Sequence, residues 1–227
     1  MIARRLVMRQ PRSRPLRVRD IALHCVGFVA EVMAEKSDGT FDYEMAGTGV
    51  FVSVPVRSLP GKSFCYFVTA RHVVNAMRDR STALFSNIQN GGRSLVPLAN
   101  PVWFVHPDAD LALIQVNDMG VFDVTTVPMH SLATEETMKA FDIGVGDEVF
   151  MIGLFEYLEG RVRNMPIVRT GNVAMFPKDQ IYIDMGDESK YVNAYLIEAR
   201  SMGGISGSPV FVRPTTYYRR KGLSHNK

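Results

Sequence analysis

The sequence is short of cysteine, of charged residues and of long apolar runs. Two cysteines among 227 residues are too few for a disulfide framework. Charged residues make up 22% of the chain and hydrophobic residues 46%, which excludes wholesale disorder because so apolar a chain can bury a core. The best apolar run, residues 21–30, is interrupted by His24 and is too short to cross a bilayer. We therefore expect a globular chain that has no membrane partner.

A secretory signal is not visible either. Within the first 20 residues, Pro11, Pro15 and several arginines occupy the place that an apolar core has in a signal peptide. Cys25 and Cys65 each lie inside an apolar run and are expected to be buried free thiols in a reducing compartment. The expected location is therefore cytoplasmic.

The net charge of +3 comes from the two ends of the chain. Residues 1–19 carry seven arginines and residues 212–227 carry five basic residues, with no acid in either segment. Residues 20–211 are therefore acidic, at a net −9. Because no aromatic residues interleave the arginines of 1–19, we favour a solvated basic arm. Nucleic-acid binding through this arm remains an alternative that the residues leave open.

Short runs rich in β-branched and aromatic residues recur between Gly, Pro, Asn and Asp from residue 20 onward. No long helical pattern separates them, so we expect an all-β fold of antiparallel barrels or sandwiches. Two short helices are expected, over residues 72–80 and 131–140. The predicted strands are residues 24–32, 48–54, 64–70, 82–88, 102–105, 111–116, 148–155, 166–176, 181–184, 191–198 and 208–212.

The break in the strand series predicts two β units. Residues 1–19 form the basic arm, 20–117 the N-terminal unit, 118–143 a linker and 144–227 the C-terminal unit. No internal repeat at a fixed period is visible.

Three segments carry the groups that nucleophilic hydrolysis needs, namely a hydroxyl, a base that takes its proton and an acid that orients the base. The first, Phe67-Val-Thr-Ala-Arg-His72, ends a strand with a histidine. The second, His106-Pro-Asp-Ala-Asp110-Leu-Ala-Leu, places an acid before an apolar strand. The third, Met202-Gly-Gly-Ile-Ser206-Gly-Ser-Pro, places a serine in a glycine-rich turn.

Together these segments resemble the trypsin-like serine peptidases of the chymotrypsin fold, most closely the bacterial HtrA-like branch. That family carries its triad in the order His, Asp, Ser, within T-A-x-H, D-[IL]-A-L and G-x-S-G-[GS]-P. The matching segments here are 69–72, 110–113 and 204–209, supported by the glycine-rich segments 47–52 and 145–153. The resemblance covers about residues 24–212. It implies an all-β fold of two antiparallel barrels with the active site between them.

The resemblance also implies the role of each site residue. Ser206 would be the nucleophile, His72 the general base and Asp110 the group that orients His72. The backbone N–H groups of Gly204 and Ser206 would form the oxyanion hole. Arg200, six positions before the nucleophile, would line the substrate pocket and favour an acidic side chain at the cleavage site. The expected partner is a polypeptide substrate, with no cofactor and no metal, and the oligomeric state stays open.

Two other readings of the same residues compete with a peptidase. His106, Asp108 and Asp110 have the side-chain types of a metal cluster, but their close spacing on one short segment makes such a cluster difficult to build. The second alternative is a catalytically silent peptide- or protein-binding module on the same fold. It gains weight because the family has further strands after the nucleophile's strand, and those strands close the second barrel. We therefore expect the second barrel to be incomplete, as in a fragment of a longer protein, which would leave an unpaired sheet edge.

Overall fold

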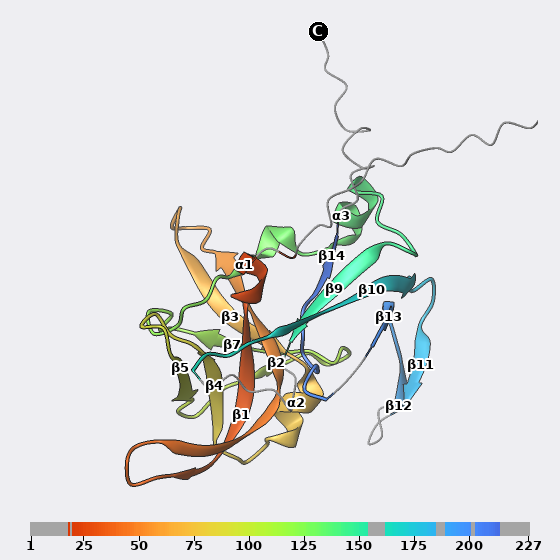
Figure 1. The fold of residues 1–227 in the computed structure, drawn as a ribbon. Coiled ribbons are helices and arrows are strands. Elements are labelled where there is room, and N and C mark those ends of the chain that lie inside the picture. The colour runs from red at the N-terminus through yellow and green to blue at the C-terminus, as the bar shows by residue number, and fades with distance from the viewer. Residues whose placement is uncertain (1–17, 19, 154–161, 185–188, 201–202, 214–227) are drawn as a thin grey trace, which may run out of the picture.

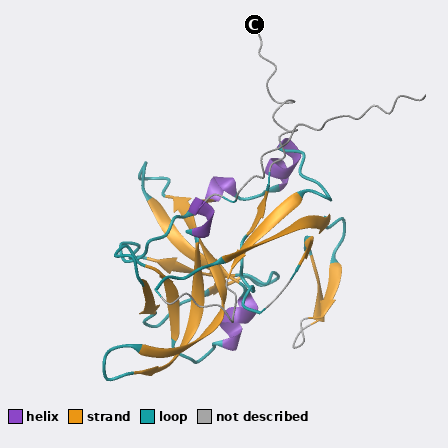
Figure 2. Cartoon of the chain, viewed as in Figure 1, coloured by secondary structure: helices purple, strands orange, loops and turns teal. Residues whose placement is uncertain are grey.

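The computed structural model describes residues 18, 20–153, 162–184, 189–200 and 203–213. Its described part is mostly β-structure, in two units that lie side by side (Figure 1). Helices are few and short, as Figure 2 shows. The predicted all-β class is confirmed, and the described strands form mainly antiparallel sheets that do not close into the two predicted barrels.

The N-terminal unit is one antiparallel sheet in the strand order β5-β4-β1-β2-β3-β7-β6. The short β8 joins β2 in parallel, with Val52 opposite Val127. Phe51 and Phe67 are fully buried and pack edge to face in the centre of this unit. The edge of the Phe67 ring and the Val68 carbonyl oxygen leave no room for a side chain at Gly49, which explains the glycine in β2. The elements are α1 (Asp20–Leu23), β1 (Val26–Glu35), β2 (Phe41–Pro55), β3 (Ser63–Thr69), α2 (Arg71–Ala76), β4 (Thr82–Asn87), β5 (Arg93–Pro97), β6 (Phe104–Val105), β7 (Ala112–Val116) and β8 (Val127–Pro128).

The C-terminal unit is a smaller sheet in the order β13-β10-β9-β14, with a separate hairpin formed by β11 and β12. Among the described strands, β13 and β14 form the two edges of this sheet. A short 3-10 turn, η1, and the helix α3 connect the two units. The elements are η1 (Met129–Ser131), α3 (Glu135–Ala140), β9 (Glu148–Gly153), β10 (Ile167–Met175), β11 (Ile181–Asp184), β12 (Ser189–Val192), β13 (Leu196–Ala199) and β14 (Val210–Val212).

Several predicted elements differ from the observed ones. The strand predicted over 191–198 is two strands, β12 and β13, separated by residues 193–195. The helix predicted over 131–140 begins only at Glu135, where the Thr134 side chain accepts the Thr137 N–H and caps it. Strand β5 and the first half of β2 were not expected. Strand β5 is short and its polar and apolar residues do not alternate, whereas residues 41–45 of β2 do alternate and this signal was overlooked.

Apolar packing and polar bonds both join the two units. Cys25 and Val26 from β1 and its approach form one buried cluster with Ile152 from β9. The segment before β10 also reaches the N-terminal unit: the Asn87 side chain accepts the Asn164 N–H at 2.7 Å and donates to the Asn164 carbonyl at 3.2 Å. The two sheets are therefore held against each other at more than one place.

Both cysteines are free and buried, as expected. Burial raises the pKa of Cys25 and of Cys65 to about 11. The cytoplasmic location inferred from these thiols stays a prediction. Within the described ranges, no helix is long and apolar enough to cross a membrane.

The burial of both thiols gives a first prediction. At neutral pH a pKa of about 11 leaves almost no thiolate, and only thiolate reacts with disulfide reagents. The native protein should therefore release no chromophore from Ellman's reagent over minutes, and both thiols should react once the chain is unfolded in guanidinium. Rapid reaction of either thiol in the native protein would contradict the buried placement.

Candidate active site

His72 lies on the short helix α2, directly after strand β3. Val73, the next residue, and Met77 just beyond the helix are almost completely buried and hold this segment against the core. The His72 side chain points to the other side and is 57% exposed. As predicted, the segment after the end of β3 exposes His72, because the neighbouring apolar residues Val73 and Met77 are buried in the core.

Asp110 lies in the turn that leads into β7. The His106 ring closes this turn, because its Nδ1 accepts the backbone N–H groups of Asp108 and Ala109 at 3.1 and 2.9 Å. Strand β7 pairs with β3 in the register Thr69 opposite Ala112. Continuing that antiparallel register by two residues brings Asp110 beside the start of α2. Strand pairing therefore sets the approach of the acid to the histidine.

Asp110 contacts His72 through both carboxylate oxygens. Its Oδ2 lies 2.6 Å from His72 Nδ1, and its Oδ1 accepts the His72 backbone N–H at 2.9 Å. Partial burial on its own would raise the pKa of Asp110. The two hydrogen bonds, with the charges of His72 and Arg71, outweigh burial and hold that pKa below its ordinary value. Asp110 is thus an ionised group that fixes both the backbone and the ring of His72.

Ser206 lies in a tight turn of the C-terminal unit, in which Ser208 N–H donates to the Ile205 carbonyl at 2.9 Å. Gly204 and Gly207 flank the serine with φ of +85° and +82°, a conformation that favours glycine. The turn docks on β2 of the other unit: Thr48 N–H donates to the Ser206 carbonyl at 2.8 Å. Thr48 Oγ1 also donates to the Gly204 carbonyl, at 2.9 Å.

The docked turn lies against the segment that carries His72. A Cβ atom added to Gly207 would overlap Thr69 Oγ1 and lie 3.0 Å from Ala70 N, at the residues that lead into α2. A Cβ added to Gly47 would lie 2.9 Å from the Val73 side chain and 3.0 Å from the Ser206 carbonyl oxygen. The structure therefore brings together the three segments that sequence motifs singled out, two from one unit and one from the other.

The turn also orients one of the two predicted oxyanion donors. Because a peptide unit is planar and trans, its N–H points opposite to its C=O. The Ile205 carbonyl faces back into the turn toward Ser208 N–H, so the Ser206 N–H of the same peptide faces out of it. Gly204, the other predicted donor residue, lies at the start of the turn, and its carbonyl accepts a hydrogen bond from Thr48.

Arg200, the predicted pocket residue, follows β13 and is exposed. Its carbonyl accepts a hydrogen bond from Arg169 Nη1 at 3.1 Å. Pairing of Gly171 with Ala199 brings β10, and hence Arg169, beside this end of β13. Arg169 and Thr48 are the residues near the site that sequence reasoning missed. Thr48 stood in a glycine-rich segment that the family resemblance included, but no motif marked its hydroxyl.

The metal alternative receives no support from the geometry. His106 Nδ1 accepts two backbone N–H groups, and Asp110 binds His72. Among the residues that the structure describes, no group of three His, Cys, Asp or Glu side chains is placed to hold a metal ion.

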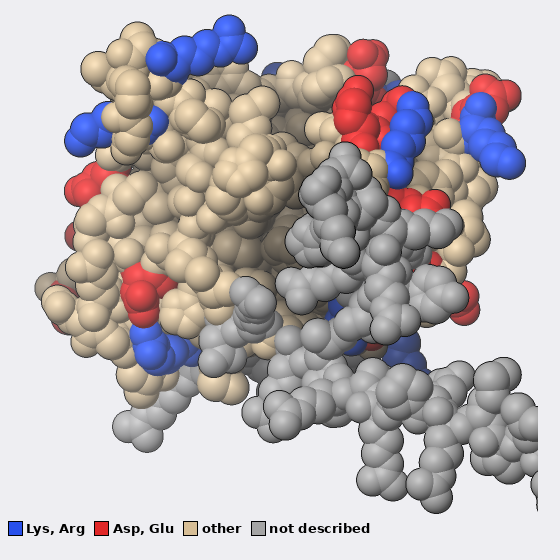
Figure 3. All heavy atoms as spheres, turned by 90° about the horizontal axis from the view of Figure 1, so that it is seen from above, with Lys and Arg blue, Asp and Glu red and all other residues tan. Residues whose placement is uncertain are grey.

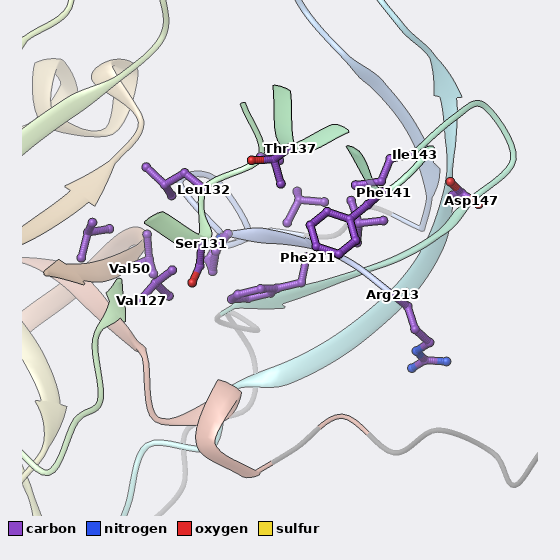
Figure 4. A pocket seen from close by; sticks show the side chains of 15 residues that line it. Val50, Val127, Ser131, Leu132, Thr137, Phe141, Ile143, Asp147, Phe211 and Arg213 are labelled. Atoms are coloured by element: carbon purple, nitrogen blue, oxygen red, sulfur yellow. The ribbon is translucent and has the colours of Figure 1, made fainter. Parts of the chain in front are cut away.

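An apolar cavity of about 290 Å³ is lined by residues of both units, and His72, Asp110 and Ser206 are not among them. Figure 4 shows Phe141 from the connecting segment and Phe211 from β14 among the side chains that line it. Val50 and Val127 line the part nearest the N-terminal sheet, and Arg213 lies at the other end (Figure 4).

Comparisons with known proteins agree with this geometry. Residues 47–214 match the family model of a trypsin-like peptidase domain. No curated protein matches the sequence. Among solved structures 137 chains match, one of which is the crystal structure of Deg5. It superposes with a TM-score of 0.55 at 17% identity, over 85% of this chain and 76% of that chain. At that identity the likeness shows a shared fold.

The close docking of the turn predicts that Gly207→Ala will disrupt the site. Alanine at φ +82° costs about 1–3 kcal/mol, and its Cβ would also overlap the Thr48 carbonyl oxygen. Gly61→Ala is the matched control, because Gly61 has φ +80° and open space around it. Urea unfolding should show Gly207→Ala to be less stable than Gly61→Ala by about 1–3 kcal/mol, the usual cost of overpacking. Equal losses would contradict the docking described.

Proposed function

Because the chain belongs to the trypsin-like peptidase domain family, we propose that it is a serine endopeptidase that cleaves polypeptides with Ser206, His72 and Asp110. The observation that carries this proposal is the His72–Asp110 pair, with Nδ1 and Oδ2 2.6 Å apart, beside the turn that holds Ser206. A peptidase domain acts on polypeptides, so the proposed substrate is a polypeptide.

In the proposed mechanism Ser206 Oγ attacks the carbonyl carbon of the scissile bond. His72 Nδ1 is occupied by Asp110, so the other ring nitrogen, Nε2, takes the serine proton and later delivers it to the leaving amine. A water molecule then attacks the acyl-enzyme, with His72 again as base, and releases the acid and free Ser206. His72 thus moves one proton from Ser206 to the leaving amine in the first half of the cycle, and one from water to Ser206 in the second half.

Asp110 and the backbone donors support that proton transfer. A carboxylate with a lowered pKa remains ionised at neutral pH, so it stabilises the imidazolium that forms when His72 takes the proton. The N–H groups of Gly204 and Ser206 would bind the negative oxygen of the tetrahedral intermediate. Loss of one such donor typically lowers kcat by about 10²–10³-fold.

Nucleic-acid binding is a weaker proposal. The arm 1–19 lies outside the described residues except for Val18. On the face shown in Figure 3, the described Lys and Arg side chains lie near acidic ones at the margin, around a large uncharged area. A phosphate backbone needs a continuous basic surface, and this face of the described residues does not offer one.

A fluorophosphonate probe tests the proposed nucleophile, because it phosphonylates serines that are activated by a neighbouring base. The wild-type protein should be labelled, while Ser206→Ala should lose the label completely and His72→Ala should lose at least about 99% of the rate. Ser131→Ala, on a serine of the apolar cavity, should be labelled as the wild type is. Labelling that persists in Ser206→Ala would place the nucleophile elsewhere, and an unlabelled wild type would favour the silent binding module.

We also propose that Arg200 selects an acidic side chain at the cleavage site, because it is exposed, lies six residues before Ser206, and its guanidinium can pair with a carboxylate. A mixed peptide library should be cleaved preferentially after Asp or Glu, and Arg200→Gln should reduce that preference by about tenfold or more. Arg163→Gln, which breaks an ion pair with Asp123 outside the nucleophile turn, should not change it. Cleavage after Lys or large apolar residues would refute this assignment.

A further inference from the structure

We propose that Thr48 is a positioning residue that holds the oxyanion hole in its active geometry from the opposite unit. This inference rests on the proposed peptidase function and adds to it a residue outside the triad. Thr48 is completely buried in β2. Through Thr48 the N-terminal sheet forms hydrogen bonds with the nucleophile turn.

The hydrogen bonds of Thr48 hold backbone carbonyls before and after the Ser206 side chain. Thr48 N–H donates to the Ser206 carbonyl and Thr48 Oγ1 donates to the Gly204 carbonyl. Between them, the Ile205 carbonyl accepts Ser208 N–H. Three consecutive carbonyls, those of Gly204, Ile205 and Ser206, are therefore held by hydrogen bonds, two of which come from Thr48.

The bond from Thr48 Oγ1 to the Gly204 carbonyl fixes the peptide that lies between the two proposed oxyanion donors. The two proposed donors, Gly204 N–H and Ser206 N–H, are linked by the Gly204–Ile205 peptide. Gly204, at φ +85°, has no Cβ to restrict its backbone, so this peptide could rotate, and its rotation would change the angle between the donors. Thr48 Oγ1 prevents that rotation by holding its carbonyl oxygen. Donors that act on a transition state must be fixed in advance, because reorganisation during the reaction would reduce their effect.

The position of Thr48 is fixed independently of the turn. Its own carbonyl accepts Thr69 Oγ1 at 2.6 Å, and Thr69 ends the strand that leads to His72. Thr48 therefore joins β3, β2 and the nucleophile turn in one hydrogen-bonded chain. A shift of the turn relative to His72 would break at least one of these bonds.

The Thr48→Val variant separates the two bonds that Thr48 makes with the turn. Valine has the same shape and keeps the backbone bond to Ser206, but it has no hydroxyl for Gly204. We expect the maximal rate of fluorophosphonate labelling to fall by about 10- to 100-fold. This fall is no larger than the one that follows removal of a whole oxyanion donor. The probe concentration that gives half the maximal rate should stay within about twofold of the wild-type value, because the substitution does not change how tightly the probe binds before it reacts. The Thr48→Ser variant, which restores the hydroxyl, should recover most of the rate.

A matched control separates positioning from general destabilisation. Thr125 Oγ1 donates to the Ile21 carbonyl at 2.9 Å, a bond of the same type and length that joins the segment before β8 to α1 and does not involve the nucleophile turn. Thr125→Val should lower the melting temperature but leave the labelling rate unchanged at temperatures where both variants are folded. The pH at which labelling reaches half its plateau should be the same in the wild type and Thr48→Val, because His72 and Asp110 are not touched.

Three results would overturn the inference. Thr48→Val that labels at the wild-type rate would show that the hydroxyl has no positioning role. A rate loss that Thr48→Ser does not recover, or that Thr125→Val reproduces, would show a merely structural effect. A wild type that is never labelled would overturn the proposed function and this inference together, whereas the first two results leave the proposed function intact.

Discussion

The hydrogen bonds of Thr48 connect the two halves of the molecule at the point where the chemistry would occur. Its amide and hydroxyl hold the turn of Ser206, and its carbonyl receives the hydroxyl of Thr69 on the strand before His72. Buried polar groups must be paired, because an unpaired one costs about 1–3 kcal/mol. A fully buried threonine with bonds on three sides therefore permits only one docking of the two sheets, and the proposed active site depends on that docking.

Glycines make such close docking possible. A Cβ at Gly47 would lie 3.0 Å from the Ser206 carbonyl oxygen, and one at Gly153 would lie 3.1 Å from Thr48 Oγ1. One at Gly207 would overlap the Thr48 carbonyl oxygen. The backbones of the two units thus approach each other more closely than side chains allow. Main-chain groups then set the geometry directly, so it does not depend on the rotamers of long side chains.

Local chemistry made the triad segments and most strands predictable from the sequence. His72, Asp110 and Ser206 each stand in a short motif with a strand or turn of its own, and the structure brings their segments together. The Thr48 hydroxyl was not predictable, because its partner is 156 residues away and no local pattern encodes so distant a contact. Strand β5 and the division between β12 and β13 were missed because exposed strands lack the strong apolar alternation of buried ones.

The division of the site between two units has a consequence for the time at which activity could arise. The proposed base and acid, His72 and Asp110, are synthesised first and pair within one unit, while Ser206 follows 96 residues after Asp110. Contacts of such long sequence separation form late in folding, after loop closure has been overcome. A nascent chain would therefore complete the proposed site only after the two units have met.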